Sequence, residues 1–425
     1  MEFDAPLRHQ HVSIGRCNGD LLRGRMLHEM ASEPDPTSCN KPSQITLEAR
    51  AVKLGDDPFS HVYVPVRRRD LKADFNITLD FRTFAPNGML LHSEGKTRRR
   101  SSYLSLGLRD GAVQLTVRRG RRTARLTAGS GLNDGNWQMA TLVRTRRKYT
   151  LLVGGAPPAS RRGPRSFRAG RALYVGGVPR AGIEQRGRDA NSLVPGRKKL
   201  EMLQTEGFKG CMKQLSISGR DIDLPSGRNI IHRVGQCMAR VEMGTFFAGD
   251  AFATYADGVV LGDKFDLRLD FRTAKLNGVL ASLAGAPGAA ALSLEIADGE
   301  VVFSVDDGSG EALRARQKFS TKYILCDNQW HSARATYTGN KVTLRLDQLP
   351  QRTVSARGGA APPWAGLSGA LYVGGLPDAA PNPTLLQTDN FKGCIRDVEL
   401  NGVRRRWSDM AQLTNVLLNS CPVQR

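Results

Sequence analysis

Apolar residues fall on alternate positions in two similar stretches of this chain, Phe75–Thr83 and Phe265–Thr273. This period buries one face of a β-strand in a core and leaves the other face in water. Each stretch is followed by Asn-Gly and a second apolar run, Met89–Leu91 in one case and Val279–Leu280 in the other. Asn-Gly between two such runs is typical of a β-hairpin. The pattern therefore predicts two copies of one β domain.

The rest of the chain repeats in the same order. Asp110-Gly111 and Asp298-Gly299 each separate two alternating runs, which again predicts a hairpin. Each copy then has a tryptophan, a Leu-Tyr-Val-Gly-Gly segment, a Phe-Lys-Gly-Cys segment and a closing cysteine. The spacing of about 190 residues indicates duplication of a whole domain, because solenoid and propeller repeats are far shorter. We predict an all-β fold of two tandem jelly-roll-like β-sandwiches over 44–237 and 243–421. Residues 1–43 would be the tail of an upstream domain and a linker.

The cysteines indicate an oxidising compartment. Cys211 with Cys237, and Cys394 with Cys421, hold equivalent positions in the two repeats, so each pair is expected to form a disulfide. Neither pair has the Cys-x-x-Cys spacing of a zinc site. Three cysteines remain, Cys17, Cys39 and Cys326. Either all three are free thiols, or Cys39 pairs with Cys326 and Cys17 has a partner upstream of the chain.

The ordered set of motifs resembles the laminin G-like module, twice over. Its members are Asp-Phe-Arg-Thr, the Asp-Gly hairpin, Asp-Asn-Gln-Trp-His, Leu-Tyr-Val-Gly-Gly-Leu-Pro and Phe-Lys-Gly-Cys. The tandem is similar to the fourth and fifth G-like domains of a laminin alpha chain. That resemblance implies a Cys39–Cys326 disulfide, and it makes Cys17 the last half-cystine of a third domain. A proteoglycan or neurexin-like protein is the alternative within the same family.

The resemblance also implies a role. We expect a secreted adhesion protein of the basement membrane, in contact with integrin-class or dystroglycan-class receptors and with other laminin chains through an upstream part. Met1–Pro6 has neither the basic start nor the apolar stretch of a signal peptide, so a secreted location would make this chain part of a longer one.

Relatives often bind calcium at one rim of the sandwich, through two acidic residues. Here the first position falls at Ser102 and Ala290, and the second falls within 165–169 and 364–368, where no residue is acidic. Calcium requires several oxygen ligands with carboxylate charge. We therefore expect no cofactor and no metal, and dystroglycan binding through that ion is in doubt.

Charge separates the two repeats. The chain has a formal net charge of +22, and residues 51–240 contain 37 Lys and Arg against 14 Asp and Glu. Paired guanidinium groups suit sulfate and phosphate oxygens, so the first repeat is expected to bind heparan sulfate or another sulfated glycan or lipid. Arg125 and a fourth cluster, Arg161 to Arg171, add to this charge. The candidate contacts are Arg98, Arg99, Arg100, Arg118, Arg119, Arg121, Arg122, Arg144, Arg146, Arg147 and Lys148.

Other readings are weaker. Nucleic acid is not expected, because few aromatic residues stand among the arginines and disulfides argue against the nucleus. His331 beside Trp330 is interpreted as structural, since no nucleophile is evident and the first repeat has Gln138 there; no catalytic residue is expected. A carbohydrate-cleaving enzyme would need two carboxylates close together in a cleft, and the sequence singles out no such pair. Both tryptophans are interpreted as core anchors. Asn76 begins an Asn-Ile-Thr glycosylation sequon on the outward face of a strand.

Overall fold

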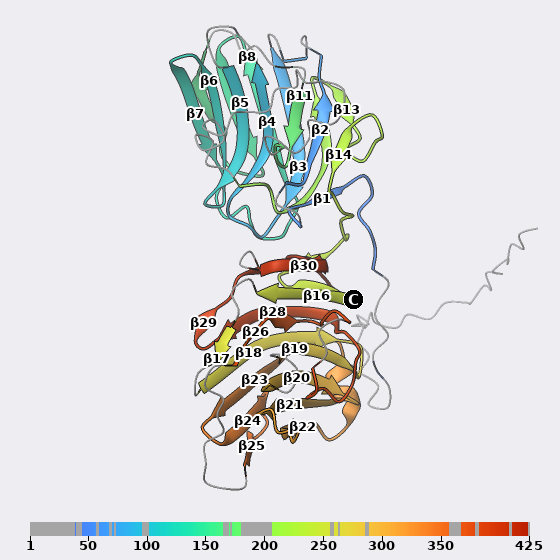
Figure 1. Ribbon diagram of the computed structural model, residues 1–425. Helices are drawn as coiled ribbons and strands as arrows, with labels where there is room; N and C mark the ends of the chain where they lie inside the picture. Colours follow the sequence, from blue (N-terminus) through green and yellow to red (C-terminus); the bar gives the residue numbers. More distant parts are fainter. Residues whose placement is uncertain are drawn as a thin grey trace, which may run out of the picture. The chain divides into compact units, whose positions relative to one another are not determined.

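The computed structural model describes two β-sandwich modules, and the all-β fold class is confirmed (Figure 1). The described residues are 39, 45–56, 59–67, 70–71, 74–95, 102–164, 170, 172–179, 206–255, 259–261, 264–284, 289–356, 367–378, 382–407 and 410–423. Cys17 and nearly all of the tail and linker expected at 1–43 lie outside them. No helix in the described part of the chain is long and apolar enough to cross a bilayer.

The first module consists of two antiparallel sheets. One contains β1 (Val52–Leu54), β3 (Phe75–Arg82), β8 (Gln138–Thr145), β9 (Lys148–Val153), β10 (Ala159–Arg162), β12 (Gly210–Ile217) and β13 (Arg220–Ile222). Its strand order is β1-β12-β3-β8-β9-β10, with β13 paired to β12. The other contains β2 (His61–Pro65), β4 (Gly88–Gly95), β5 (Ser102–Arg109), β6 (Ala112–Arg119), β7 (Arg122–Ala128), β11 (Ala172–Val175) and β14 (Ile230–His232). Its order is β14-β2-β11-β4-β5-β6-β7, so β7 and β10 are edge strands.

The second module repeats this arrangement with one long strand shared between its layers. It contains β15 (Val241–Glu242), β16 (Thr245–Tyr255), β17 (Val259–Leu261), β18 (Lys264–Thr273), β19 (Gly278–Ala284), β20 (Ala291–Ala297), β21 (Glu300–Asp306), β22 (Leu313–Gln317), the 3-10 helix η1 (Lys322–Cys326), β23 (His331–Thr338), β24 (Lys341–Leu346), β25 (Arg352–Ser355), β26 (Leu367–Gly369), β27 (Leu371–Val373), β28 (Lys392–Leu400), β29 (Val403–Arg404), β30 (Met410–Leu417) and β31 (Cys421–Pro422). The main path is β22-β21-β20-β19-β27-β16-β28-β18-β23-β24-β25, and β16 pairs both with β27 and with β28.

The alternating residues form the two cores. The inward side chains of β3 are at most 4% exposed and those of β18 at most 1%. Both predicted Asp-Gly turns are present, with φ of 50° and 75° at Asp110 and Gly111 and nearly the same values at Asp298 and Gly299. Positive φ at both positions is the geometry of a tight hairpin turn.

The hairpin predicted at Asn-Gly is wrong. β3 and β4 lie in different sheets, so Asn87-Gly88 ends a crossover between layers. Asn87 Oδ1 instead accepts a hydrogen bond of 2.9 Å from the backbone N–H of Asp110 and so caps the next hairpin. A Cβ on Gly88 would lie 3.0 Å from Phe208 Cα. The dipeptide is therefore explained by long-range packing.

Neither Trp137 nor Trp330 belongs to the main core of its module; each lies beside a buried arginine, and Trp137 packs against the small cluster of Ala51, Cys211 and Cys237. Trp137 is half-buried, and the Arg82 guanidinium carbon lies 4.8 Å from its ring centre. In the second module Arg396 lies 4.0 Å from the ring centre of Trp330, and Arg272 lies 5.3 Å from it. Cation–π contacts of this kind stabilise a charge that is removed from water.

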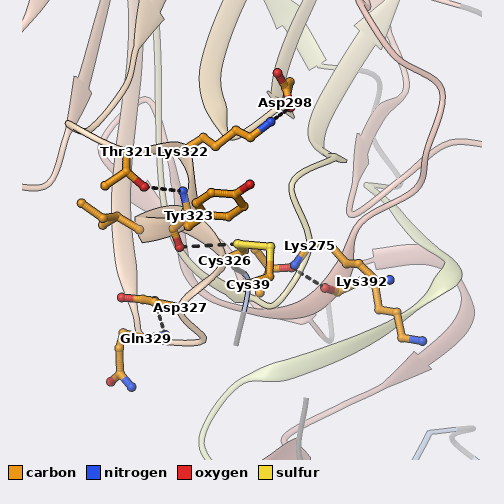
Figure 2. Close-up of a disulfide and its surroundings, with 12 residues drawn as sticks. Cys39, Lys275, Asp298, Thr321, Lys322, Tyr323, Cys326, Asp327, Gln329 and Lys392 are labelled. Atoms are coloured by element: carbon orange, nitrogen blue, oxygen red, sulfur yellow. Dashed lines mark hydrogen bonds and ion pairs between the residues drawn. A yellow bond between two sulfur atoms is a disulfide. The ribbon is translucent and has the colours of Figure 1, made fainter. Parts of the chain in front are cut away.

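The structure forms three disulfides. Cys211–Cys237 and Cys394–Cys421 close the two modules at equivalent places. Cys39 is bonded to Cys326, which ends η1 in the second module (Figure 2). Thr321 caps that helix by accepting a 3.1 Å hydrogen bond from the Tyr323 N–H.

Candidate glycan-binding surface

The first group of cations lies on the hairpin between β6 and β7. Arg119 pairs with Arg122 across the turn, where Gly120 has a φ of 59° that favours glycine. Arg121 and Arg122 are exposed, whereas Arg118 and Arg119 are half-buried. Arg118 Nε donates to the Gly120 carbonyl at 3.0 Å, so this side chain folds back on its own turn. Two of the four predicted arginines here are thus fully available to a ligand.

The second group lies on the hairpin between β8 and β9. Thr145 pairs with Lys148, and Arg146 and Arg147 make the turn. Arg146, Arg147 and Lys148 are all exposed. Arg146 has a φ of 55°, which residues with a Cβ adopt rarely. Its backbone N–H donates to Asp74 Oδ1 at 2.5 Å, which holds the turn in this conformation.

The third group lies on the edge strand β10. Arg161 and Arg162 are exposed, and Arg162 pairs directly with Lys148 of β9. Just beyond the strand, the Gly163 N–H donates to the Arg147 carbonyl at 2.8 Å. The second and third groups are therefore adjacent.

The edge strands of the two sheets meet at this point. Arg161 Nη1 donates to the backbone carbonyl of Arg125 on β7 at 3.5 Å. A Cβ on Gly163 would lie 3.3 Å from Ala124 Cβ of β7, so the backbones approach closely. Arg125 itself is exposed between buried neighbours. We call the resulting surface the basic edge, and it consists of Arg121, Arg122, Arg125, Arg146, Arg147, Lys148, Arg161 and Arg162.

None of the eight cations of the basic edge forms an ion pair with a carboxylate that the structure describes. Some exposed cations of the second module are paired, whereas others, such as Lys264, Arg268 and Lys341, also form no ion pair with a described carboxylate. Arg316 lies 3.4 Å from Glu300, Lys322 lies 2.9 Å from Asp298, and Arg334 makes two contacts with Asp266. The two modules thus share a fold, and the basic edge groups eight exposed cations without a described ion pair on the module that carries the excess of Lys and Arg.

Arg144 does not belong to this surface, which corrects its place among the candidate contacts. Its side chain is only 2% exposed, with the guanidinium carbon 5.4 Å from the Tyr149 ring centre and 5.8 Å from that of Phe75. Strand β8 alternates, and Ala140, Leu142 and Arg144 all point inward. Arg98, Arg99 and Arg100 lie outside the described residues. The candidate list had omitted Arg125, Arg161 and Arg162, although their basic runs were evident.

The described calcium positions offer poor donors. Ser102 is 1% exposed and its hydroxyl has no hydrogen-bond partner among the described residues, while Ala290 supplies only a methyl group. Neither provides the negative charge that calcium requires. Among the described residues no group of three or more His, Cys, Asp and Glu could hold a metal. The side chains of the second acidic positions lie outside the described residues, so the absence of calcium stays a prediction.

His331 is fully engaged in hydrogen bonds. Its Nδ1 lies 2.7 Å from Asp347 Oδ2, and its Nε2 lies 3.2 Å from the Ile324 carbonyl and 3.3 Å from Asp327 Oδ1. All these partners are acceptors, so both ring nitrogens carry protons. Burial lowers the pKa of His331, but the bonds and charges of Asp327 and Asp347 outweigh burial and raise the pKa to about 9. A charged, fully bonded imidazolium ties η1 to the sheet and cannot act as a base.

These features define a class: tandem, disulfide-closed sandwiches without a catalytic site among the described residues. The laminin G domain model matches residues 81–220 and 271–403. The chain therefore belongs to the laminin G domain family, whose modules serve adhesion rather than catalysis.

Laminin alpha subunits are among the relatives. Laminin subunit alpha-1 of Mus musculus is 26% identical over 409 residues, which are 94% of this chain and 12% of the relative. Laminin subunit alpha-3 of Homo sapiens is 26% identical over 380 residues, covering 88% of the chain and 10% of the relative. The chain thus spans only a small part of these proteins. The homology and the three disulfides indicate an extracellular location.

Solved structures show the same fold. Domains LG4-5 of the mouse laminin alpha1 chain superimpose with a TM-score of 0.74 at 24% identity, over 93% of this chain and 100% of that one. The LG1-3 region of the laminin alpha2 chain gives a TM-score of 0.57 at 17% identity, over 87% of this chain and 66% of that one.

Proposed function

We propose that this chain is an adhesion segment of a laminin alpha-like protein of the extracellular matrix, and that its basic edge binds sulfated glycans such as heparan sulfate, or sulfated lipids. Through the rest of the protein it would contact cell-surface receptors of the integrin or dystroglycan class and other laminin chains. The relatives favour this over a proteoglycan or neurexin-like protein. The adhesion role is supported by the family; the ligand class is supported by the surface.

The observation that carries the proposal is the convergence of cations without counter-ions. Residues 121–125, 146–148 and 161–162 come from three separate segments and meet where β7 and β10 lie side by side. A linear polyanion can contact several such cations at once and release its own counter-ions, which makes binding strong and salt-dependent. Guanidinium groups add paired hydrogen bonds to sulfate oxygens.

The test is retention of the whole chain, expressed in cells that do not N-glycosylate, on immobilised heparin across a salt gradient. We expect the variant R147S/K148S/R162S to elute at lower salt than the wild type. The slope of log affinity against log salt should fall by about three, because each cation that contacts the polymer contributes roughly one released ion.

The matched control is R316S/K318S/K322S, which removes the same net charge from exposed, carboxylate-paired positions of the second module. It should elute close to the wild type. Equal losses in both variants would mean that heparin senses only net charge, and the basic edge would no longer be the binding surface. Release of the wild type by a calcium chelator would contradict the expected absence of calcium.

A further inference from the structure

Asn76 occupies an open position in the middle of strand β3. Its neighbours Phe75 and Ile77 are 4% and 1% exposed and belong to the core, while Asn76 faces solvent. The Ser218 N–H donates to the Asn76 carbonyl at 2.8 Å, so the backbone is paired there. The Asn76 amide group itself has no hydrogen bond to any residue that the structure describes. It is therefore free to accept a substituent without loss of a structural contact.

The equivalent position of the second module is already occupied by a structural interaction. Asp266 stands there, and both of its carboxylate oxygens bind Arg334. The duplication thus offers an internal reference: the outward position is used for an ion pair in one module and left with an unengaged amide in the other. Asn76, Ile77 and Thr78 together meet the Asn-x-Thr requirement for N-glycosylation.

The strand register places Asn76 close to the basic edge. Asn76 lies opposite Val143, Val143 opposite Thr150, and Thr150 opposite Ser160, across β3, β8, β9 and β10. Lys148 is two residues from Thr150 and Arg162 two residues from Ser160, so both point to the same face as Asn76. With strands about 4.8 Å apart and about 3.4 Å per residue, Lys148 is roughly 12 Å from Asn76 and Arg162 roughly 16 Å.

We propose that Asn76 carries an N-linked glycan and that this glycan covers Lys148 and Arg162, so that sequon occupancy sets the affinity of the basic edge for sulfated polymers. The inference rests on the proposed function. An N-linked oligosaccharide is bulky and hydrophilic, and it extends over the surface around its attachment point. At these distances it competes for space with a polymer lying along β9 and β10.

The modification is a transfer from a lipid-linked oligosaccharide pyrophosphate donor. A bond forms between the anomeric carbon of the first sugar and Asn76 Nδ2. The bond from that carbon to the donor's phosphate oxygen breaks, the lipid pyrophosphate leaves, and the amide loses one proton. Thr78 supplies the hydroxyl of the sequon, and its Oγ1 lies 3.2 Å from Thr141 Oγ1 in the folded module.

The experiment compares four forms of the full chain secreted from eukaryotic cells: wild type, N76Q, T78A and T78S. N76Q and T78A each destroy the sequon, the first at its asparagine and the second at its threonine, whereas T78S preserves it. Intact mass reports glycan occupancy, and heparin elution reports affinity. We expect glycan on the wild type and T78S only. N76Q and T78A should elute at higher salt, with a salt slope larger by about two because two cations become accessible.

The outcomes separate the two proposals. A wild-type mass without glycan, or the same elution for all four forms, would overturn the regulation by Asn76. Earlier elution of N76Q and T78A would overturn it as well. If no form is retained on heparin, glycosylated or not, the proposed function fails, while the mass still decides whether Asn76 is modified.

Discussion

The two modules share the strand order of their main layers but differ in net charge, since residues 51–240 contain 37 Lys and Arg against 14 Asp and Glu while the rest of the chain contains 25 against 26. In the second module some exposed cations are paired with described carboxylates, as Arg334 is with Asp266 and Lys322 with Asp298, whereas others such as Lys264 and Arg268 are not. In the first module the basic edge has no such partners among the described residues. A duplicated scaffold has thus kept its core and changed its surface. The excess of Lys and Arg gives the first module a positive field that the rest of the chain lacks.

The comparison extends to a buried position, where the largest effect is expected. His331 is replaced by Gln138 in the first module, and Gly154 stands where the second module has Asp347. The pKa of His331 is raised from 6.5 to about 9, so its contribution to stability is fully present below pH 6.5 and is lost as the pH rises through 9. We expect the unfolding free energy of the second module to fall by about 3 kcal/mol over that range.

Denaturant unfolding of the wild type and H331Q at several pH values measures this effect. H331Q should be less stable at pH 6 and nearly independent of pH up to 9. The reciprocal variant Q138H offers a control: among the described residues Gln138 hydrogen-bonds one carboxylate, that of Asp134, whereas His331 contacts two, so the pH dependence of Q138H should be smaller. If the unfolding free energy of the wild-type second module stayed constant from pH 6 to 9, His331 would not be the imidazolium assigned here.

A second difference concerns the buried arginine beside each tryptophan. Arg272 is 8% exposed, and its Nη1 lies 2.7 Å from Glu242 Oε1, which also accepts a hydrogen bond from Trp330 Nε1 at 3.2 Å. E242A leaves this guanidinium without its counter-charge and should lower the unfolding free energy of the second module by about 2 kcal/mol. Thermal unfolding with separate transitions for the two modules provides the measurement.

The first module provides the matched variant. Glu48 pairs with Lys213 at 2.7 Å, while Arg82 donates to two backbone carbonyls. E48A should therefore cost only about 1 kcal/mol, because the buried arginine keeps its acceptors. Equal losses for E48A and E242A would show that Glu242 supports the fold in some way other than through Arg272.

The smallest effect is expected at Arg146, where function and stability should change in opposite directions. R146G removes a cation and also relieves a left-handed conformation that costs a residue with a Cβ about 1 kcal/mol. The first module should become more stable by about that amount, while the heparin salt slope falls by about one. R147G removes the same charge from a neighbour without positive φ, so it should weaken binding without added stability.

Sequence predicts the fold well where the signal is local. The alternation in β3 and β18 identifies both strands and their buried faces, and Asp-Gly identifies the tight turns. Asn87-Gly88 misleads because its two roles, capping Asp110 and packing on Phe208, involve residues 23 or more positions away. A local pattern cannot show that the next strand belongs to the other sheet.

The candidate surface is predictable only in part. The inward position of Arg144 follows from the alternation of Ala140 and Leu142, so the signal was present in the sequence. The meeting of Arg125 with Arg161 was not, because it depends on two edge strands from different sheets approaching each other. Charge runs report which module is basic, whereas topology decides which of the runs share a face.

The disulfide between Cys39 and Cys326 has a mechanical consequence. It joins the segment before the first module to the second module, across a sequence separation of 287 residues. Tension that enters the chain ahead of Cys39 and leaves through the second module passes through the sulfur bridge. The first module then lies in a covalently closed loop that carries no load, so the basic edge keeps its shape while the chain is pulled.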